Sequence, residues 1–85
     1  MQKLKPEEIA TIYAVYQACD GSTQAHPPIH RIRAKFIKEL KENATKWVER
    51  VARKPERYIQ KHTNGEKTYS ITMNGIRLLK ELNLI

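Results

Sequence analysis

The sequence predicts an α+β fold that is mainly helical, and three observations favour this class. Four stretches repeat apolar residues at helical spacing, and they lie at about 6–19, 28–41, 44–54 and 73–83. A β-hairpin at about 58–72 is indicated because β-branched and aromatic residues flank Asn64 and Gly65, a pair that favours a tight turn. The chain has 85 residues, 40% of them hydrophobic, which suits one small domain with a modest core. We therefore expect residues 1–85 to form a single domain.

The first helix is expected to begin at Pro6, because proline is favoured at the first helical position. Its predicted apolar face comprises Ile9, Ile12, Tyr13 and Tyr16. Further apolar residues widen this face: Ala10, Ala14, Val15 and Ala18. The helix therefore either packs on two sides, against its own domain and a second subunit, or simply has the high helix propensity of alanine. Cys19, the only cysteine, is either a half-buried residue at the helix end or a disulfide link between two subunits.

The second helix is expected to begin near Pro28 and to reach Lys41. Its apolar residues recur at helical spacing and predict one inner face: Ile29, Ile32, Phe36, Ile37 and Leu40. Basic residues lie around the rest of its circumference, so only some of them can face a common partner.

The third helix follows Asn43, a candidate N-cap. Its predicted inner stripe is Ala44, Val48, Val51 and Ala52, with Trp47 at the edge as a core anchor rather than a base-stacking platform. The predicted outer face carries Thr45, Lys46, Glu49, Arg50 and Arg53. Cations and short polar groups on one face are what contacts to phosphates and base edges require. Glu49 either accepts from a cytosine amino group or forms an i, i+4 pair with Arg53.

The hairpin register depends on the length of its turn. If Asn64 and Gly65 form a two-residue turn, Tyr58 pairs with Ile71. This register buries three residues on one face: Tyr58, Tyr69 and Ile71. A loop one residue longer would instead place Ile59 on that face.

Residues 69–79, Tyr-Ser-Ile-Thr-Met-Asn-Gly-Ile-Arg-Leu-Leu, follow a pattern of aromatic, aliphatic, Thr, Gly and a leucine-rich helix. Thr72 fits the N-cap of that helix. The pattern resembles the end of many winged helix-turn-helix domains, and the resemblance covers roughly residues 28–82. It implies a three-helix core, a β-hairpin wing and a C-terminal helix, with the third helix in the DNA major groove and the wing along the backbone or minor groove. It also implies a short extended segment beside the wing, expected at Ala25 and His26.

The positive charge of the chain is concentrated in one segment. Eleven Lys and Arg and four Glu lie within residues 30–61, which therefore carry the whole formal net charge of +7. This distribution suits a polyanionic partner. A generic solvated lysine surface is the alternative interpretation.

These observations predict sequence-specific binding of double-stranded DNA by a small transcriptional regulator. The expected contacts of the third helix are Thr45, Lys46, Glu49, Arg50 and Arg53. The expected wing and backbone contacts are Arg31, Arg33, Lys61, Asn64 and Lys67. An RNA-binding or ribosome-associated winged helix is an alternative, because fold and positive charge do not distinguish DNA from RNA. A protein-interaction module within a larger assembly is the other.

No catalytic constellation emerges from the sequence, so we expect no enzyme activity, no cofactor and no metal. Cys19, His26 and His30 are spaced as possible zinc ligands, but Pro27 and Pro28 prevent a regular helix from aligning the two histidines. No apolar run approaches the roughly 20 residues of a membrane span, so a cytoplasmic, DNA-associated protein is expected. A homodimer through the first and C-terminal helices is also expected.

Overall fold

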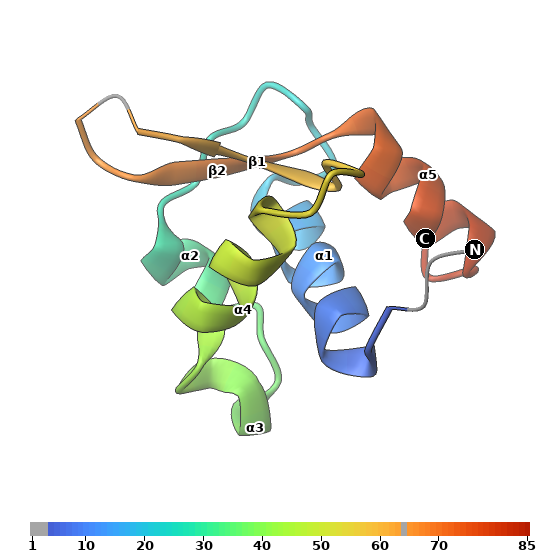
Figure 1. The fold of residues 1–85 in the computed structure, drawn as a ribbon, viewed down its shortest axis with the longest axis horizontal. Helices are drawn as coiled ribbons and strands as arrows, with labels where there is room; N and C mark the ends of the chain where they lie inside the picture. Colours follow the sequence, from blue (N-terminus) through green and yellow to red (C-terminus); the bar gives the residue numbers. More distant parts are fainter. Residues whose placement is uncertain (1–3, 64) are drawn as a thin grey trace.

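Within residues 4–63 and 65–85, which the computed structural model describes, the chain forms five helices and a two-stranded antiparallel hairpin (Figure 1). The elements in chain order are α1 (Pro6–Ala18), α2 (Ile29–Arg33), α3 (Lys38–Lys41), α4 (Ala44–Ala52), β1 (Ile59–His62), β2 (Thr68–Ile71) and α5 (Met73–Glu81). These elements confirm the α+β class.

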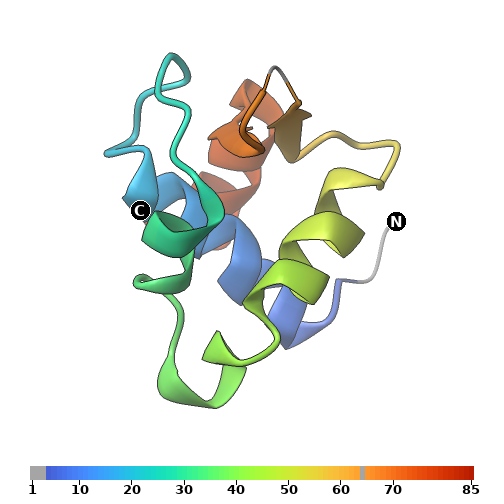
Figure 2. The ribbon, with the colours of Figure 1, turned by 90° about the vertical axis from the view of Figure 1, so that its left-hand side faces the viewer.

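Helix α1 is the central element, since it contacts α2, α4, α5 and strand β2. In Figure 2 it lies between α2 and α4, and in Figure 1 the hairpin runs across the top of the molecule with α5 at one side. The side chains that these elements bury are mostly aliphatic: Ile12, Val15, Ile32, Phe36, Val48, Val51, Ile59, Tyr69, Ile71 and Leu79. The hairpin therefore covers one end of a helical core.

The buried face of α1 differs from the predicted one. Ile12 and Val15 are fully buried, whereas Ile9, Tyr13 and Tyr16 are only partly covered. The two tyrosine rings stack at the edge of the core, with centroids 6.5 Å apart. Cys19, at the C-cap, is 1% exposed, so it is fully buried rather than half-buried as predicted.

The prediction of one helix over 28–41 is wrong. Helix α2 ends at Arg33, and the chain continues through tight turns to Ile37, whose extended backbone (φ −65°, ψ 154°) precedes α3. Phe36 enters the core at 4% exposure, while Ile37 points to solvent at 58%. The predicted continuous helix places both side chains on its inner face, whereas the break buries only the larger one.

The hairpin has the register of the longer loop, so the prediction of a two-residue turn is wrong. Ile59 pairs with Ile71 and His62 with Thr68, which leaves residues 63–67 in the turn. Asn64, a predicted turn residue and wing contact, lies outside the described residues. The core takes the aliphatic side chain of Ile59, because this shift by one residue exchanges the two faces of the strand.

An extended segment does pair with the hairpin, but it lies one or two residues later than predicted. The backbone N–H of Tyr69 donates to the carbonyl of Pro27 at 3.0 Å, and Pro28 forms a bridge with Thr68. His26 instead stacks on His62, with ring centroids 4.1 Å apart. The loop before α2 is therefore fastened to the outer edge of β2.

Helix α5 begins as predicted at Thr72, whose hydroxyl accepts from the N–H of Gly75 at 3.2 Å. Position 75 requires glycine for a steric reason, because a Cβ there would lie 2.3 Å from the carbonyl oxygen of Tyr58. The start of α5 thus packs directly on the backbone that enters β1. After the helix, three apolar side chains remain about two-fifths exposed: Leu82, Leu84 and Ile85.

Candidate nucleic-acid interface

Helix α4 has one buried face and one basic outer face. Ala44, Val48 and Val51 are fully buried against the core, and Trp47 packs partly buried beside them, as predicted. Asn43 precedes the helix at the N-cap position, although its side chain makes no capping hydrogen bond. The residues on the opposite side line a surface hollow of about 430 Å³: Lys46, Glu49, Arg50 and Arg53. The structure therefore brings four of the five predicted helix contacts together.

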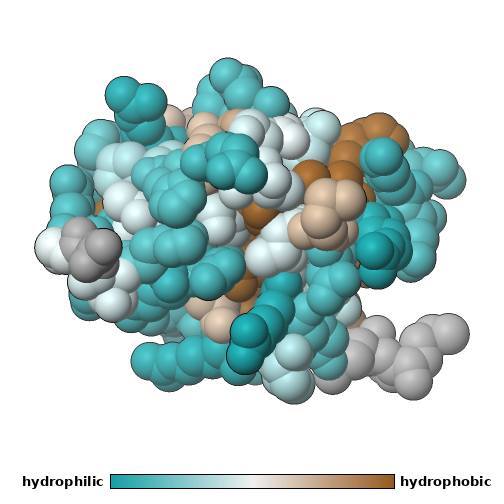
Figure 3. Space-filling view, turned by 90° about the horizontal axis from the view of Figure 1, so that it is seen from above, coloured by the Kyte–Doolittle hydropathy of each residue, from teal (hydrophilic) through white to brown (hydrophobic). Residues whose placement is uncertain are grey.

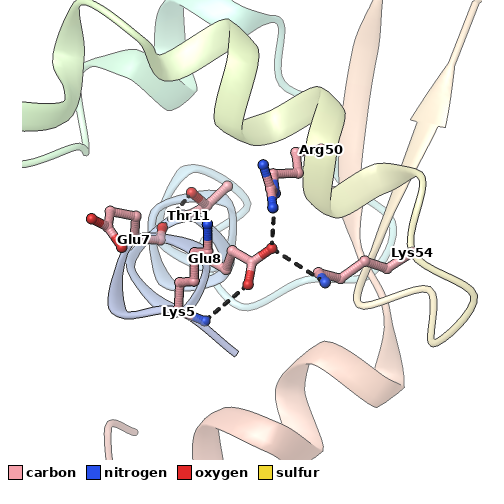
Figure 4. Close-up of polar contacts among 6 residues, drawn as sticks. All are labelled: Lys5, Glu7, Glu8, Thr11, Arg50 and Lys54. Carbon is pink, nitrogen blue, oxygen red and sulfur yellow. Dashed lines mark hydrogen bonds and ion pairs between the residues drawn. The ribbon is translucent and has the colours of Figure 1, made fainter. Parts of the chain in front are cut away.

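Arg50 and Lys54 are tied to α1 by a buried carboxylate. Glu8 is 2% exposed, and its Oε2 atom lies 3.3 Å from Nε of Arg50 and 3.2 Å from Nζ of Lys54 (Figure 4). Its Oε1 atom accepts a 2.9 Å hydrogen bond from the backbone N–H of Lys5. Glu8 therefore caps the first turn of α1 and also holds one cation of α4, Arg50, and one just after it, Lys54.

The ionic state of Glu8 follows from these contacts. Burial alone would raise the pKa of its carboxyl group, but the Lys5 hydrogen bond and the cations of Lys54 and Arg50 lower it below its ordinary value of 4.5. The group therefore stays charged at neutral pH. A buried carboxylate is stable only with such partners, and here three donors supply them.

Glu49 joins α4 to the hairpin. Its carboxylate accepts a 2.9 Å hydrogen bond from Nζ of Lys61 and a 2.5 Å hydrogen bond from the hydroxyl of Tyr69. Burial would raise the pKa of Glu49, but these two donors lower it. Burial, and then the contact with Glu49, raise the pKa of Tyr69. The predicted i, i+4 pair with Arg53 is therefore replaced by a pair with Lys61.

The two arginines of α2 point to different regions. Nη2 of Arg33 donates to the hydroxyl of Thr45 at 3.4 Å, which links α2 to the start of α4. Arg31 instead lines a hollow at the C-terminal end of α1, beside Ala18 and Asp20. Only Arg33 therefore adjoins the outer face of α4, although both arginines are among the predicted backbone contacts.

Two cations of this face are uncommitted. Among residues 4–63 and 65–85, neither Lys46 nor Arg53 has an ion-pair or side-chain hydrogen-bond partner, and both are exposed. Lys67 is exposed in the hairpin turn, and its charge contributes to lowering the pKa of Glu49. On the outer face of α4, within the described part of the chain, Arg50 is therefore fixed by a carboxylate, whereas Lys46 and Arg53 are free for an external anion.

Sequence reasoning missed Glu8 and Tyr69. The only local sign of Glu8 is its place in the first turn after Pro6, because its partner Arg50 is 42 residues away. Tyr69 lies 20 residues from Glu49, and the predicted register assigned its ring to the core without a partner for the hydroxyl. Both contacts depend on tertiary packing, which residue spacing does not encode.

Comparison of the chain with protein-family models, with curated proteins and with solved structures finds no match. The described part of the chain holds no group of three side chains suited to binding a metal ion. No helix in that part is long and apolar enough to cross a membrane. The structure itself defines a small α+β domain whose basic helix face lies next to a hairpin.

Proposed function

We propose that the chain is a winged helix-turn-helix domain that binds double-stranded DNA sequence-specifically, as a small transcriptional regulator. In this assignment α1, α2 and α4 are the core helices, the hairpin is the wing and α5 is the C-terminal helix. The order of these elements supports the assignment, as does the hairpin directly after α4, whose outer face is basic. In this assignment the second helix of the domain is divided into α2 and α3.

One observation carries the proposal: the outer face of α4 gathers Lys46, Arg50 and Arg53 around one hollow. An α-helix fits the major groove of B-form DNA, and side chains at its centre reach base edges. Lys46 and Arg53 supply uncommitted charge for phosphates, and Lys67 extends this positive surface onto the wing. Glu49, held by Lys61 and Tyr69, positions the wing against α4 rather than contacting a base.

The proposed regulator acts as a homodimer, in which the apolar end of one copy covers that of another. Leu82, Leu84 and Ile85 are 42%, 42% and 41% exposed after α5, and Figure 3 shows apolar surface gathered over α5 while the hairpin side is hydrophilic. Two copies would place their α4 helices in successive major grooves, about 34 Å apart.

Selection of bound fragments from a random pool of DNA duplexes tests the proposed function. We expect one enriched sequence, with two related half-sites spaced by about one helical turn. Affinity for that sequence should exceed affinity for random DNA by about 10³-fold or more, and both should fall steeply as salt rises.

An RNA duplex and a salt series provide the controls for this selection. Stronger binding to structured RNA than to any DNA duplex would contradict the DNA proposal and favour an RNA-binding domain. Absence of binding to either nucleic acid at about 50 mM salt, where nonspecific attraction is strong, would favour a protein-interaction module.

A further inference from the structure

We infer that Glu8 is a positioning residue that orients Arg50 to recognise a guanine edge in the major groove. The inference rests on the proposed DNA binding, and it adds the base that the site reads and a residue outside α4 on which this recognition depends. Glu8 lies on α1 and is 2% exposed, so it holds Arg50 from beneath without itself reaching the DNA.

The contact uses only part of the guanidinium group. Nε of Arg50 donates to Glu8 at 3.3 Å, and the two terminal nitrogens have no partner among the residues that the structure describes. The side chain is still 48% exposed. Its free end can therefore donate two hydrogen bonds outward, and guanine presents two acceptors, O6 and N7, in the major groove.

A second contact limits the movement of Arg50. Its Cζ atom lies 5.7 Å from the centre of the Trp47 ring, within the range of a cation–π interaction. Trp47 is itself partly buried against the core. Arg50 is thus held by a carboxylate at Nε and by an aromatic ring, which lowers the entropy that binding a base would cost.

Glu8 is rigid enough to serve this purpose. The backbone N–H of Lys5 fixes Oε1 at 2.9 Å, and Nζ of Lys54 shares Oε2 at 3.2 Å. Lys54 also keeps the carboxylate paired when Arg50 is substituted, so Arg50 variants need not expose an unpaired buried charge. Figure 4 shows that the neighbouring Glu7 points away from Arg50 and Lys54. Glu7 therefore offers a charge-matched control.

The test uses the full chain, the duplex enriched in the selection and a random duplex of the same length. The readout is the ratio of the two affinities, by fluorescence anisotropy, for four proteins: wild type, Glu8→Gln, Glu7→Gln and Arg50→Ala. We expect Arg50→Ala to lower this ratio about tenfold or more, as the loss of a paired arginine contact does. Glu8→Gln should lower it about two- to tenfold, the effect of releasing one ordered side chain. Glu7→Gln should leave it unchanged, although both glutamine variants remove one negative charge.

Two further measurements separate positioning from stability. Glu8→Gln should add nothing to the loss already caused by Arg50→Ala, because a positioning effect needs the arginine. Replacement of guanine by 7-deazaguanine in the enriched site removes the N7 acceptor, and it should weaken wild type but not Arg50→Ala. Thermal unfolding of each variant verifies folding. If Glu8→Gln does not fold, Glu8→Asp replaces it, since aspartate keeps the charge but its shorter side chain withdraws the carboxylate from Nε of Arg50.

The outcomes distinguish this inference from the proposed function. If wild type binds no duplex, the proposed function fails and this inference with it. If wild type selects a sequence but Glu8→Gln or its substitute Glu8→Asp keeps the full affinity ratio, only the positioning role is overturned. An equal loss from Glu8→Gln with and without Arg50 would also overturn it, as would indifference of wild type to 7-deazaguanine.

Discussion

Glu49 shows how one side chain on an exposed face can serve structure rather than contact a ligand. Helical spacing identified its place on the outer face of α4, but its two partners belong to the hairpin. The spacing of residues along a helix indicates on which face a side chain lies, but not which other element packs against that face. The same holds for Arg50: helical spacing predicted its exposure but not its pairing with Glu8.

Substitution of Glu49 should loosen the hairpin. Glu49→Gln removes the charge from two hydrogen bonds of a carboxylate that is 19% exposed, so we expect a loss of about 1–2 kcal/mol in the free energy of unfolding. Urea unfolding measures it. Glu66→Gln, on the exposed hairpin turn, is the control and should change stability by less than about 0.5 kcal/mol. Equal stabilities of the two variants would contradict the assigned role of Glu49.

The lowered pKa of Glu8 predicts the pH dependence of stability. The folded protein holds this carboxyl group ionised more strongly than the unfolded chain does, with its ordinary value of 4.5. As pH falls below 4.5, the unfolded chain takes up the proton first, so stability is lost in this range. Stability measured against pH should therefore fall less steeply below 4.5 in Glu8→Gln than in wild type. Parallel curves would exclude this contribution.

The two helices whose starts were predicted correctly carry their own start signals in the sequence. Pro6 begins α1 and Thr72 caps α5, and both helices start where predicted. The second helix failed because neither glycine nor proline marks the break near Ile37, and its apolar spacing fits a continuous helix equally well. The hairpin register could not be fixed, since either Tyr58 or Ile59 offers an apolar side chain to the core.

The break between α2 and α3 makes adjacent apolar residues unequal. Phe36→Ala should destabilise the fold by about 3–5 kcal/mol, because this ring is 4% exposed. Ile37→Gln should change stability by less than about 0.5 kcal/mol, because Ile37 is 58% exposed. Urea unfolding of the two variants decides between the observed break and one continuous helix, in which both losses would be large.

The proposed DNA-facing side predicts that two exposed lysines differ in their effect on DNA affinity and its salt dependence. Lys67 lies in the hairpin turn and Lys80 in α5, and both are exposed. Under the proposed function, Lys67→Ala should weaken binding to enriched and random DNA alike. It should also reduce the slope of log affinity against log salt by about one unit. Lys80→Ala carries the same charge change and should have little effect. Equal slopes for the two variants would refute the assigned DNA-facing side.

The proposed dimer places the apolar end of the molecule between two copies. Leu84→Lys combined with Ile85→Lys introduces charges there, and we expect it to shift the protein to monomer in sedimentation velocity experiments. Ile37→Lys is the control for a charge at another exposed apolar site, because Ile37 is also exposed but immediately precedes α3. A wild-type protein that sediments as a monomer at tens of micromolar would refute the dimer.

The segment of Pro27 and Pro28 has a consequence for self-association. It covers the outer edge of β2, where the N–H of Tyr69 is already bonded to the carbonyl of Pro27. Exposed strand edges recruit strands from other molecules and so begin fibres. Neither proline has a backbone N–H, so an incoming strand finds no donor at these two positions. The two prolines that end the loop thus also prevent the small sheet from growing on this side.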